Sequence, residues 1–426
     1  MSADRTVSPG VPPLTADDID EAAARISALV TRTPLEFSDR LSHATGAKVY
    51  LKREDLQIVR SYKIRGAYNL LTQLDQAQLA AGVVCSSAGN HAQGFALACR
   101  IVGVRGRVYV PAKTPKQKRD RIAYHGGDFI EVIVGGATYD DAAEAARADV
   151  ERTGATLVPP FDDPRTMAGQ GTIAVEILEQ LDGDPDLLVI PVGGGGCISG
   201  VTTYVTQRSP GTAILGVEPA GAASMKAALA AGEPVTLDYV DQFVDGAAVN
   251  RAGDQPFAAL AAAGDRVSVI AADEGAVCTA MLDLYQNEGI IAEPAGALSV
   301  AGLLSTDIQP GSVVVCLISG GNNDVSRYGE ILERSLVHKG LKHYFLVDFP
   351  QEPGALRRFL DEILGPGDDI TLFEYVKRNN RETGAALVGI ELGCADDYDG
   401  LRSRMDDSGL HVQPLEPGSP AYQYLT

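Results

Sequence analysis

The chain has 426 residues, of which 45% are hydrophobic and 22% charged, a composition typical of a globular protein with two or three domains. Its formal net charge of −20 disfavours binding to nucleic acid or to an anionic membrane surface. No run approaches the roughly 18 uninterrupted apolar residues of a membrane span, so we expect no transmembrane helix.

The N-terminal residues 1–15, MSADRTVSPGVPPLT, lack the basic start and the apolar core of a secretory signal. We expect them to form a flexible lead-in to a helix that begins near Ala16. The six cysteines form no C-x-x-C pair and match no zinc motif. Most of them fall in apolar runs, as core residues do, which favours a protein of the reducing cytoplasm.

From residue 47 to about 335, short β-type runs alternate with longer, alanine-rich helical runs, such as 138–153, 165–181 and 273–288. This alternation predicts parallel sheets with helices on their faces. The predicted strands have the sequences VYLKR, GVVCSS, RVYVP, FIEVIV, TLVPP, LLVIPV, ILGVEP, RVSVIA and VVVCLISG.

Lys63 lies in the segment REDLQIVRSYKIRGAYN, beside aromatic and apolar residues at a predicted helix start. Most single lysines are solvated surface charges, but an ammonium group is unfavourable at the positive end of a helix dipole. Desolvation favours the neutral amine instead, which is nucleophilic and forms Schiff bases with carbonyl compounds. Lys63 is therefore a candidate catalytic residue.

Four consecutive glycines, Gly193–Gly196, end the predicted strand of VIPVGGGGCISG and precede a predicted helix. Glycine allows positive φ and close backbone approach, and free N–H groups at a helix start suit a bound phosphate. The alternative is a tight turn with nothing bound. Nucleotide motifs fit poorly, because Cys197 stands where a P-loop has lysine. A dinucleotide fingerprint needs another glycine spacing, although Glu218 lies at a tolerable distance.

Three segments follow predicted strands, namely Ser86–His91, Gly193–Gly196 and Ser319–Asn322. In open α/β sheets, ligands bind beyond the carboxyl ends of the strands. We therefore expect the three segments to meet at one ligand site.

The pattern changes after residue 338. A strand, KHYFLVDF, and a helix, EPGALRRFLDEIL, precede two strands, ITLFEYVKRN and GAALVGIEL, around a turn at Asn379-Asn380. A helix, DYDGLRSRMDDSG, and a last strand, HVQPLEP, follow. This β-α-β-β-α-β order predicts a separate ferredoxin-like domain.

The chain resembles the threonine dehydratase (threonine deaminase) family of pyridoxal-phosphate (PLP) enzymes, which have fold type II. The resemblance implies a catalytic domain of two parallel-sheet α/β subdomains over 16–337, with the smaller subdomain at about 60–155. It also implies PLP as the cofactor. The segments that carry it are KREDLQIVRSYKIRGAYN, SSAGNHAQG, PPFDDPRTMAGQGT, PVGGGGCISG, AEPAGALSVAG and CLISGGN, in the family's order.

The resemblance further implies roles for single residues. Lys63 would form the Schiff base and act as general base, Asn90 would hydrogen-bond the oxygen of the ring's 3-hydroxyl group, and Ser319 would face the pyridine nitrogen. His91 is equally open to a purely structural role at a helix start. The phosphate would bind Gly193, Gly194, Gly195, Gly196 and the N–H of Cys197, and the substrate carboxylate would bind the loop with Ser87, Asn90 and His91.

Some residues of this chain differ from those of related PLP enzymes, and these differences disfavour certain activities. Serine racemases of this fold carry a second serine where this chain has Ala88, so racemisation is disfavoured. They also bind a divalent metal through an acid that Ser224 replaces here, so we expect no metal although Glu218 remains. The β-replacement synthases have Thr-Ser-Gly-Asn-Thr-Gly in place of SSAGNHAQG and are disfavoured too. A neutral Ser319 beside the ring nitrogen suits elimination better than transamination.

The implied reaction is the dehydration and deamination of L-threonine to 2-oxobutanoate and ammonia, the first step of isoleucine biosynthesis. A serine-preferring dehydratase is the nearest alternative, because one methyl group gives only about 1–3 kcal/mol of discrimination. A sensor that binds amino acids and has lost catalysis is an alternative of another class.

Residues 338–426 resemble the ACT-like regulatory domain of biosynthetic threonine dehydratases. The segment FPQEPGALRRFL carries this resemblance, and Pro353-Gly354 forms the turn where such domains bind amino acids. Isoleucine is the implied inhibitor, and a dimerisation module without ligand is the alternative. Longer relatives carry two such units, so a single unit favours a ligand site shared between two subunits. The resemblance also implies a homotetramer.

Overall fold

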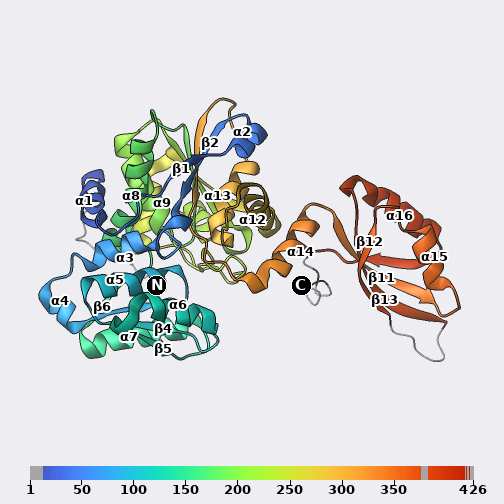
Figure 1. Ribbon diagram of the computed structural model, residues 1–426, viewed down its shortest axis with the longest axis horizontal. Helices are drawn as coiled ribbons and strands as arrows, with labels where there is room; N and C mark the ends of the chain where they lie inside the picture. The colour runs from blue at the N-terminus through green and yellow to red at the C-terminus, as the bar shows by residue number, and fades with distance from the viewer. Residues whose placement is uncertain (1–12, 376–381, 418, 420–421, 423–426) are drawn as a thin grey trace, which may run out of the picture. The chain divides into compact units, whose positions relative to one another are not determined.

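The computed structural model describes residues 13–375, 382–417, 419 and 422. The chain divides into two compact units, Met1–Asn323 and Asp324–Thr426 (Figure 1). The boundary expected from the sequence follows residue 337, whereas helix α14 (Tyr328–His338) groups with the second unit. Most of the expected lead-in and the expected turn at Asn379-Asn380 lie outside the described residues.

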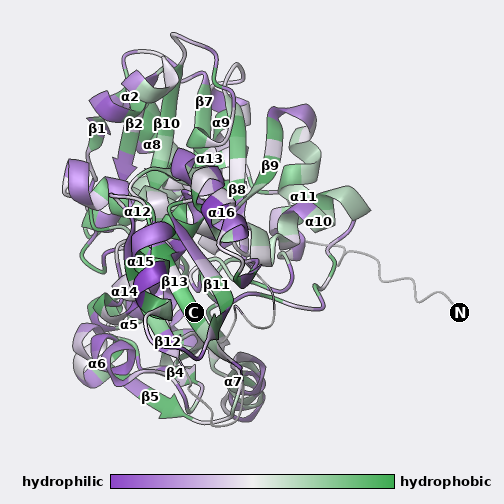
Figure 2. Cartoon of the chain, turned by 90° about the vertical axis from the view of Figure 1, so that its right-hand side faces the viewer, coloured by the Kyte–Doolittle hydropathy of each residue, from purple (hydrophilic) through white to green (hydrophobic). Residues whose placement is uncertain are grey.

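The larger sheet of the first unit has the strand order β1-β2-β10-β7-β8-β9 among the described residues. All neighbours are parallel except β1, which pairs antiparallel with β2. Its central strands are rich in buried aliphatic side chains, as expected for a parallel sheet covered on both faces (Figure 2). The strands are β1 (Leu35–Phe37), β2 (Lys48–Arg53), β7 (Leu187–Pro191), β8 (Ala213–Pro219), β9 (Val267–Ala272) and β10 (Val313–Ile318).

The smaller sheet has the order β5-β4-β3-β6 and is parallel throughout its described residues. Helices α5, α6 and α7 surround it in Figure 1. Its core includes Phe95, Val108 and Ile122, each with an exposed fraction of 0%. The strands are β3 (Val83–Ser86), β4 (Gly106–Val110), β5 (Ile130–Val134) and β6 (Thr156–Leu157).

Several helices of the first unit begin at a side-chain cap. In α1 the hydroxyl of Thr15 accepts from the N–H of Asp18, whose carboxylate accepts from Thr15 in return, which completes a capping box. Asp163 caps α8, where Pro164 occupies the first turn. The helices are α1 (Ala16–Ile26), α2 (Asp39–Thr45), α3 (Lys63–Leu71), α4 (Gln76–Ala81), α5 (Asn90–Val102), α6 (Lys116–Gly126), α7 (Tyr139–Thr153), α8 (Pro164–Gln180), α9 (Gly196–Arg208), α10 (Ser224–Ala231), α11 (Asp254–Ala263), α12 (Glu274–Glu288) and α13 (Pro294–Leu304).

The second unit is an antiparallel sheet of order β12-β13-β11-β14 with two helices on one face (Figure 1). Phe345 and Val347 of the sheet pack with Phe359 and Met405 of those helices in one core. This arrangement confirms the predicted β-α-β-β-α-β domain. Its elements are β11 (Lys342–Pro350), α15 (Ala355–Glu362), β12 (Asp369–Tyr375), β13 (Thr383–Glu391), α16 (Tyr398–Asp407) and β14 (His411–Pro414).

The predicted alternation of strands and helices over 47–335 is confirmed, including the parallel sheets. The helical runs at 138–153, 165–181 and 273–288 correspond to α7, α8 and α12. In the part of the chain that the structure describes, no helix is both long and apolar enough to cross a membrane.

Candidate functional site

The three segments predicted to meet are brought together. Strands β7 and β10, which carry two of them, are direct neighbours in the larger sheet, with Cys316 opposite Val189. The third segment follows β3 in the smaller sheet. Asn322 joins it to the larger sheet, because its side-chain Nδ2 donates to Oδ1 of Asn90 at 2.8 Å. The site therefore lies where the carboxyl ends of strands from both sheets face each other.

Lys63 begins α3 next to this junction. The preceding residue, Tyr62, donates its backbone N–H to the carbonyl oxygen of Ser319 at 3.2 Å, which ties the helix start to the end of β10. The Nζ atom of Lys63 donates to the carbonyl oxygen of Pro160 at 3.1 Å. Burial lowers the pKa of Lys63 to about 8, against the opposing influence of Cys197 and Glu293. A substantial part of this lysine is therefore a neutral amine near physiological pH.

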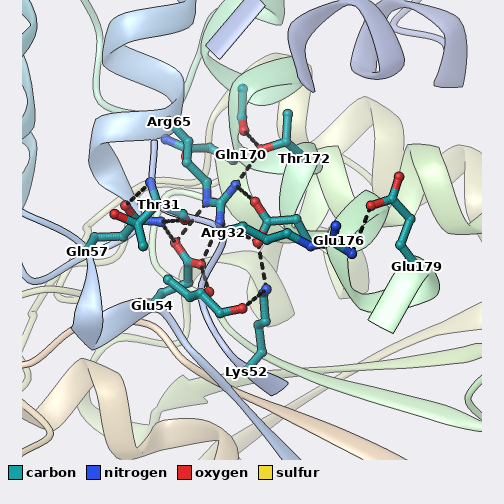
Figure 3. A network of polar contacts seen from close by, with 12 residues as sticks. Thr31, Arg32, Lys52, Glu54, Gln57, Arg65, Gln170, Thr172, Glu176 and Glu179 are labelled. Carbon is teal, nitrogen blue, oxygen red and sulfur yellow. Dashed lines mark hydrogen bonds and ion pairs between the residues drawn. The ribbon is translucent and has the colours of Figure 1, made fainter. Parts of the chain in front are cut away.

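A buried charge cluster of Lys52, Glu54, Arg65 and Glu176 holds α3 in place (Figure 3). Arg65 uses all five N–H groups, since it also donates to Thr172 at 3.0 Å. It lies two residues after Lys63 on the same helix. The cluster thus fixes the helix that carries the candidate catalytic amine.

The charges of this cluster balance within the protein interior. Lys52 donates to Glu176 at 2.6 Å, to Gln180 at 2.9 Å and to the carbonyl oxygen of Thr33 at 2.7 Å, so its three N–H groups are all used. Burial lowers the pKa of the Lys52 ammonium. Burial by itself would raise the pKa of Glu54, but the neighbouring Arg65 and Lys52 keep it below its usual value. We therefore treat Arg65 and Glu54 as a charged pair.

The glycine run makes a turn that larger residues could not make. Gly195 has φ of +92°, a conformation that favours glycine. The ring of Phe161 packs against Gly194 so closely that any Cβ atom there would overlap it. A Cβ atom on Gly196 would lie 2.8 Å from Cα of the same phenylalanine. Phe161, from the PPFDDPRT segment, thus shapes the turn. The sequence did not reveal this contact.

The N–H groups at the start of α9 lack partners within the helix, as at every helix N-terminus. They follow a strand end and belong to residues without large side chains, so an anion can approach them. Burial raises the pKa of the Cys197 thiol to about 12, which keeps this group neutral. Cys197 can therefore contribute its backbone N–H to a phosphate without adding negative charge.

Asn90 occupies the first turn of α5 and lies between two polar partners. Its Nδ2 donates to Oε1 of Glu293 at 2.5 Å, and its Oδ1 accepts from Asn322. Glu293 has an exposed fraction of 6%, and burial, with Asp245 as the second cause, raises its pKa to about 7. Glu293 and Asn322 lie in the segments AEPAGALSVAG and CLISGGN, but the sequence pattern alone does not indicate a role for either side chain.

Ser319 follows β10 and has an exposed fraction of 4%. Its hydroxyl donates to the carbonyl oxygen of Ala295 at 3.2 Å and keeps two lone pairs that can accept a hydrogen bond. The adjacent Gly320 forms a β-bridge with Ser61, two residues before Lys63. Ser319 therefore lies near the start of α3, which carries Lys63.

The three residues expected to receive the substrate carboxylate differ in their surroundings. Ser87 and Asn90 are half-buried, whereas His91 is buried. Nε2 of His91 lies 2.9 Å from the carbonyl oxygen of Val158, and burial, aided by Lys63, lowers the pKa of the ring to about 3. The imidazole is thus neutral and anchored to the backbone. This geometry agrees with the structural reading of His91, and the role of the loop stays a prediction.

Comparison with known proteins adds to this geometry. Residues 26–320 match the family of pyridoxal-phosphate dependent enzymes. Residues 333–425 match the C-terminal regulatory domain of threonine dehydratase. A biosynthetic L-threonine dehydratase from Mycobacterium tuberculosis is 77% identical over 428 residues, which covers 100% of both chains. The chain belongs to the biosynthetic threonine dehydratase family.

Solved structures include relatives of the threonine dehydratase family. The processed form of threonine deaminase isoform 2 from Solanum lycopersicum is 37% identical, with a TM-score of 0.70 over 77% of this chain and 99% of that one. Maize serine racemase is 32% identical, with a TM-score of 0.70 over 77% of this chain and 99% of that one. The expected fold type II is therefore confirmed.

The residues of this threonine dehydratase site fit the family's cofactor, PLP. The hydroxyl groups of Ser61 and Ser86 are buried without a hydrogen-bond partner among the described residues. Buried polar atoms are nearly always paired, so these groups indicate a polar ligand. An amine with a lowered pKa, on Lys63, and a glycine turn before a helix supply the groups that an aldehyde and a phosphate require.

Glu218, in β8 of this threonine dehydratase fold, stabilises a helix start. Its Oε1 accepts from the N–H of Met225 at 2.7 Å, and its Oε2 accepts from the N–H of Lys226 at 2.8 Å. Both carboxylate oxygens thus stabilise the start of α10. The described residues contain no group of three or more His, Cys, Asp or Glu side chains that could hold a metal ion.

The regulatory unit of this threonine dehydratase family member contains a cavity of about 40 Å³. It is lined in part by His343, Tyr398 and Glu416, near the start of β11, whereas Pro353-Gly354 follows the end of that strand. His343 stacks on Tyr398 with ring centroids 4.1 Å apart, and its Nε2 lies 2.8 Å from the carbonyl oxygen of Gly340. A cavity of this size holds a few water molecules, not an amino acid.

Proposed function

We propose that this chain dehydrates and deaminates L-threonine to 2-oxobutanoate and ammonia with PLP, as the first step of isoleucine biosynthesis. The observation that carries the proposal is the position and chemistry of Lys63. This residue begins α3 at the junction of the two sheets, and burial lowers the pKa of its amine to about 8. Support for the substrate comes from the relatives at up to 77% identity, which are named biosynthetic L-threonine dehydratases.

The residues around this amine suit the cofactor's groups. Lys63 would bind the aldehyde carbon covalently, Asn90 would donate to the oxygen of the 3-hydroxyl group, and Ser319 would face the ring nitrogen. When bound, PLP withdraws electron density from the substrate's Cα atom and so acidifies its Cα–H bond. The phosphate would bind the N–H groups of Gly193, Gly194, Gly195, Gly196 and Cys197.

The same residues account for the proton movements. The neutral Nζ of Lys63 would accept the Cα proton of the bound substrate. The electron pair of the Cα–H bond would then form the Cα–Cβ double bond as the Cβ–O bond breaks. The departing hydroxide and one proton, equivalent to the proton removed from Cα, would make one water molecule. The N–H groups at the start of α5, near Ser87 and Asn90, would hold the substrate carboxylate. Hydrolysis of the released enamine gives 2-oxobutanoate and ammonia.

Steady-state kinetics with both candidate substrates test this function. We expect a higher kcat/KM for L-threonine than for L-serine, with 2-oxobutanoate and ammonia formed in equal amounts. The discrimination is limited to about 1–3 kcal/mol, because the substrates differ by one methyl group. A higher kcat/KM for L-serine would make the chain a serine-preferring dehydratase. A purified protein that binds PLP but turns over neither amino acid would support the sensor instead.

We further propose that the C-terminal unit binds isoleucine and that bound isoleucine inhibits the enzyme. We also propose that the enzyme is a homotetramer and works in the cytoplasm. Support for regulation comes from the match of residues 333–425 to the regulatory domain of threonine dehydratase. Feedback logic selects isoleucine, because 2-oxobutanoate feeds its synthesis. Because the cavity of this unit is small and its lining residues Lys342 and Tyr344 both pair with Glu333, a ligand site shared between two such units is the better candidate.

A further inference from the structure

Glu293 is the N-cap residue of α13, a position where short polar side chains such as Asp or Ser often cap the helix. Here the side chain makes no such capping bond. Its Oε1 instead accepts from Nδ2 of Asn90 at 2.5 Å, while its backbone N–H donates to the carbonyl oxygen of Gly320 at 3.1 Å. The carboxyl group is therefore committed to the junction between the two sheets.

Asn322 approaches Asn90 from the other side. Its Nδ2 donates at 2.8 Å to Oδ1 of Asn90 and at 2.8 Å to the carbonyl oxygen of Val59, so both of its amide hydrogens are used. The two contacts fix which end of the Asn90 amide faces which neighbour. If the amide were flipped beside an ionised Glu293, its carbonyl oxygen would face the carboxylate and its NH₂ would face the NH₂ of Asn322, so both hydrogen bonds would be lost.

In the observed orientation, Asn90 has one amide hydrogen left after its bond to Glu293. We propose that Glu293 and Asn322 are positioning residues, which hold Asn90 so that it offers this N–H donor, and not its carbonyl oxygen, to an acceptor in the site. This inference rests on the proposed function, in which the acceptor is the oxygen of the cofactor's 3-hydroxyl group. Glu293 and Asn322 themselves act through Asn90.

The charge of Glu293 makes this arrangement sensitive to pH. Its pKa is raised to about 7 by burial and by Asp245, against the opposing effects of Asn90 and Lys118. Lys63 and Tyr62 also interact with it electrostatically. Lys118 and Asp245 form an ion pair of 2.6 Å, so they largely compensate each other. As the pH rises through about 7, the ionised carboxylate becomes the stronger acceptor and holds Asn90 more firmly.

The test measures the affinity of the cofactor-stripped protein for PLP by absorption titration at about pH 6 and about pH 8, together with kcat. Asn322→Ala removes one hydrogen bond to Asn90, so we expect PLP affinity about tenfold weaker at both pH values. Asn322→Ser restores one donor and should recover part of the affinity. Glu293→Gln should bind like the parent at about pH 6 and about tenfold more weakly at about pH 8.

Glu218→Gln is the matched control, because Glu218, like Glu293, is a buried carboxylate whose pKa is raised to about 7 by burial. We expect its PLP affinity to keep the parent's dependence on pH. Circular dichroism of each stripped variant verifies folding, and if Asn322→Ala does not fold, the Asn322→Ser and Glu293→Gln results decide.

Equal affinities of parent, Glu293→Gln and the Asn322 variants at both pH values would overturn the positioning role while leaving the proposed function intact. If the ratio between the PLP affinities of the parent and Glu293→Gln is the same at both pH values, the charge of Glu293 has no role in holding Asn90. If the parent itself does not bind PLP, the proposed function fails and takes this inference with it.

Discussion

Arg65 and Glu54 form a bidentate ion pair, with Nε 2.8 Å from Oε2 and Nη2 2.7 Å from Oε1, and both side chains have an exposed fraction of 0%. Arg65 follows Lys63 by two residues on α3, so this pair fastens the helix start of the site to the end of β2. A buried pair of this kind adds little net stability over an apolar pair of similar volume, but the removal of one partner is strongly destabilising.

Replacing Arg65 by methionine should lower the free energy of unfolding by about 3–5 kcal/mol, because Glu54 would keep a buried charge without its partner. Arg152→Met is the matched control, since Arg152 pairs with Asp149 but its side chain is 70% exposed. Its loss should lower the stability by less than about 1 kcal/mol. Chemical denaturation of the two variants measures the difference. Equal, small losses would show that the buried cluster does not fasten α3.

Gly194→Ala should weaken PLP binding, because the added Cβ atom overlaps the ring of Phe161 and must displace the turn before α9. We expect the affinity for PLP to fall about tenfold or more, because a displaced turn would break hydrogen bonds to the phosphate. Gly211→Ala is the control, since no atom lies within 4 Å of an added Cβ atom there. Titration with PLP compares them. Parent-like binding by Gly194→Ala would remove the glycine run from the phosphate site.

His91 should make the fold labile to acid. The pKa of its ring falls from 6.5 to about 3 because of burial, so the folded state binds fewer protons than the unfolded state between these values. The stability that His91 contributes is therefore present above pH 6.5 and is lost as the pH falls towards about 3. His91→Gln should show a shallower loss of unfolding free energy over this range than the parent. The exposed His43→Gln serves as control and should follow the parent curve.

The C-terminal unit should transmit the effect of isoleucine. A chain that ends at Asn323 keeps the first compact unit whole, so we expect it to stay active. It should lose its response to isoleucine, whereas the full chain should bind threonine about 5–150-fold more weakly in the presence of the effector. Threonine saturation curves of both chains, with isoleucine or valine added, measure this. Equal inhibition of both chains would place the effector site in the catalytic unit.

Much of the site could be predicted because its residues lie in short contiguous motifs. Strand patterns ending in glycine or in small polar residues indicate the carboxyl edge of a parallel sheet, and β3, β7 and β10 end within two residues of the predicted ends. Lys63 was recognised because its neighbours are apolar at a helix start. These features depend on local sequence alone.

The residues that the sequence did not reveal depend on contacts between distant segments. Glu293 and Asn90 are 203 positions apart, and neither residue type shows by itself that the other faces it. Likewise, the sequence does not distinguish a buried charge from an exposed one at Glu54, Arg65 and Glu176. These side chains lose most of their exposure only because β2, α3 and α8 pack together. Charged residues are rarely buried, so sequence patterns favour the surface for each of them.

The most direct measurement of the central claim locates the covalent bond between the protein and its cofactor. Borohydride reduction of the PLP-loaded protein, followed by peptide mapping, should place the pyridoxyl group on Lys63. Lys63→Ala should keep its fold, remain unlabelled and lose turnover, because the variant lacks the amine that would bind the cofactor. A pyridoxyl label on a different lysine, or turnover by Lys63→Ala at the parent rate, would contradict the assignment of Lys63 as the catalytic residue.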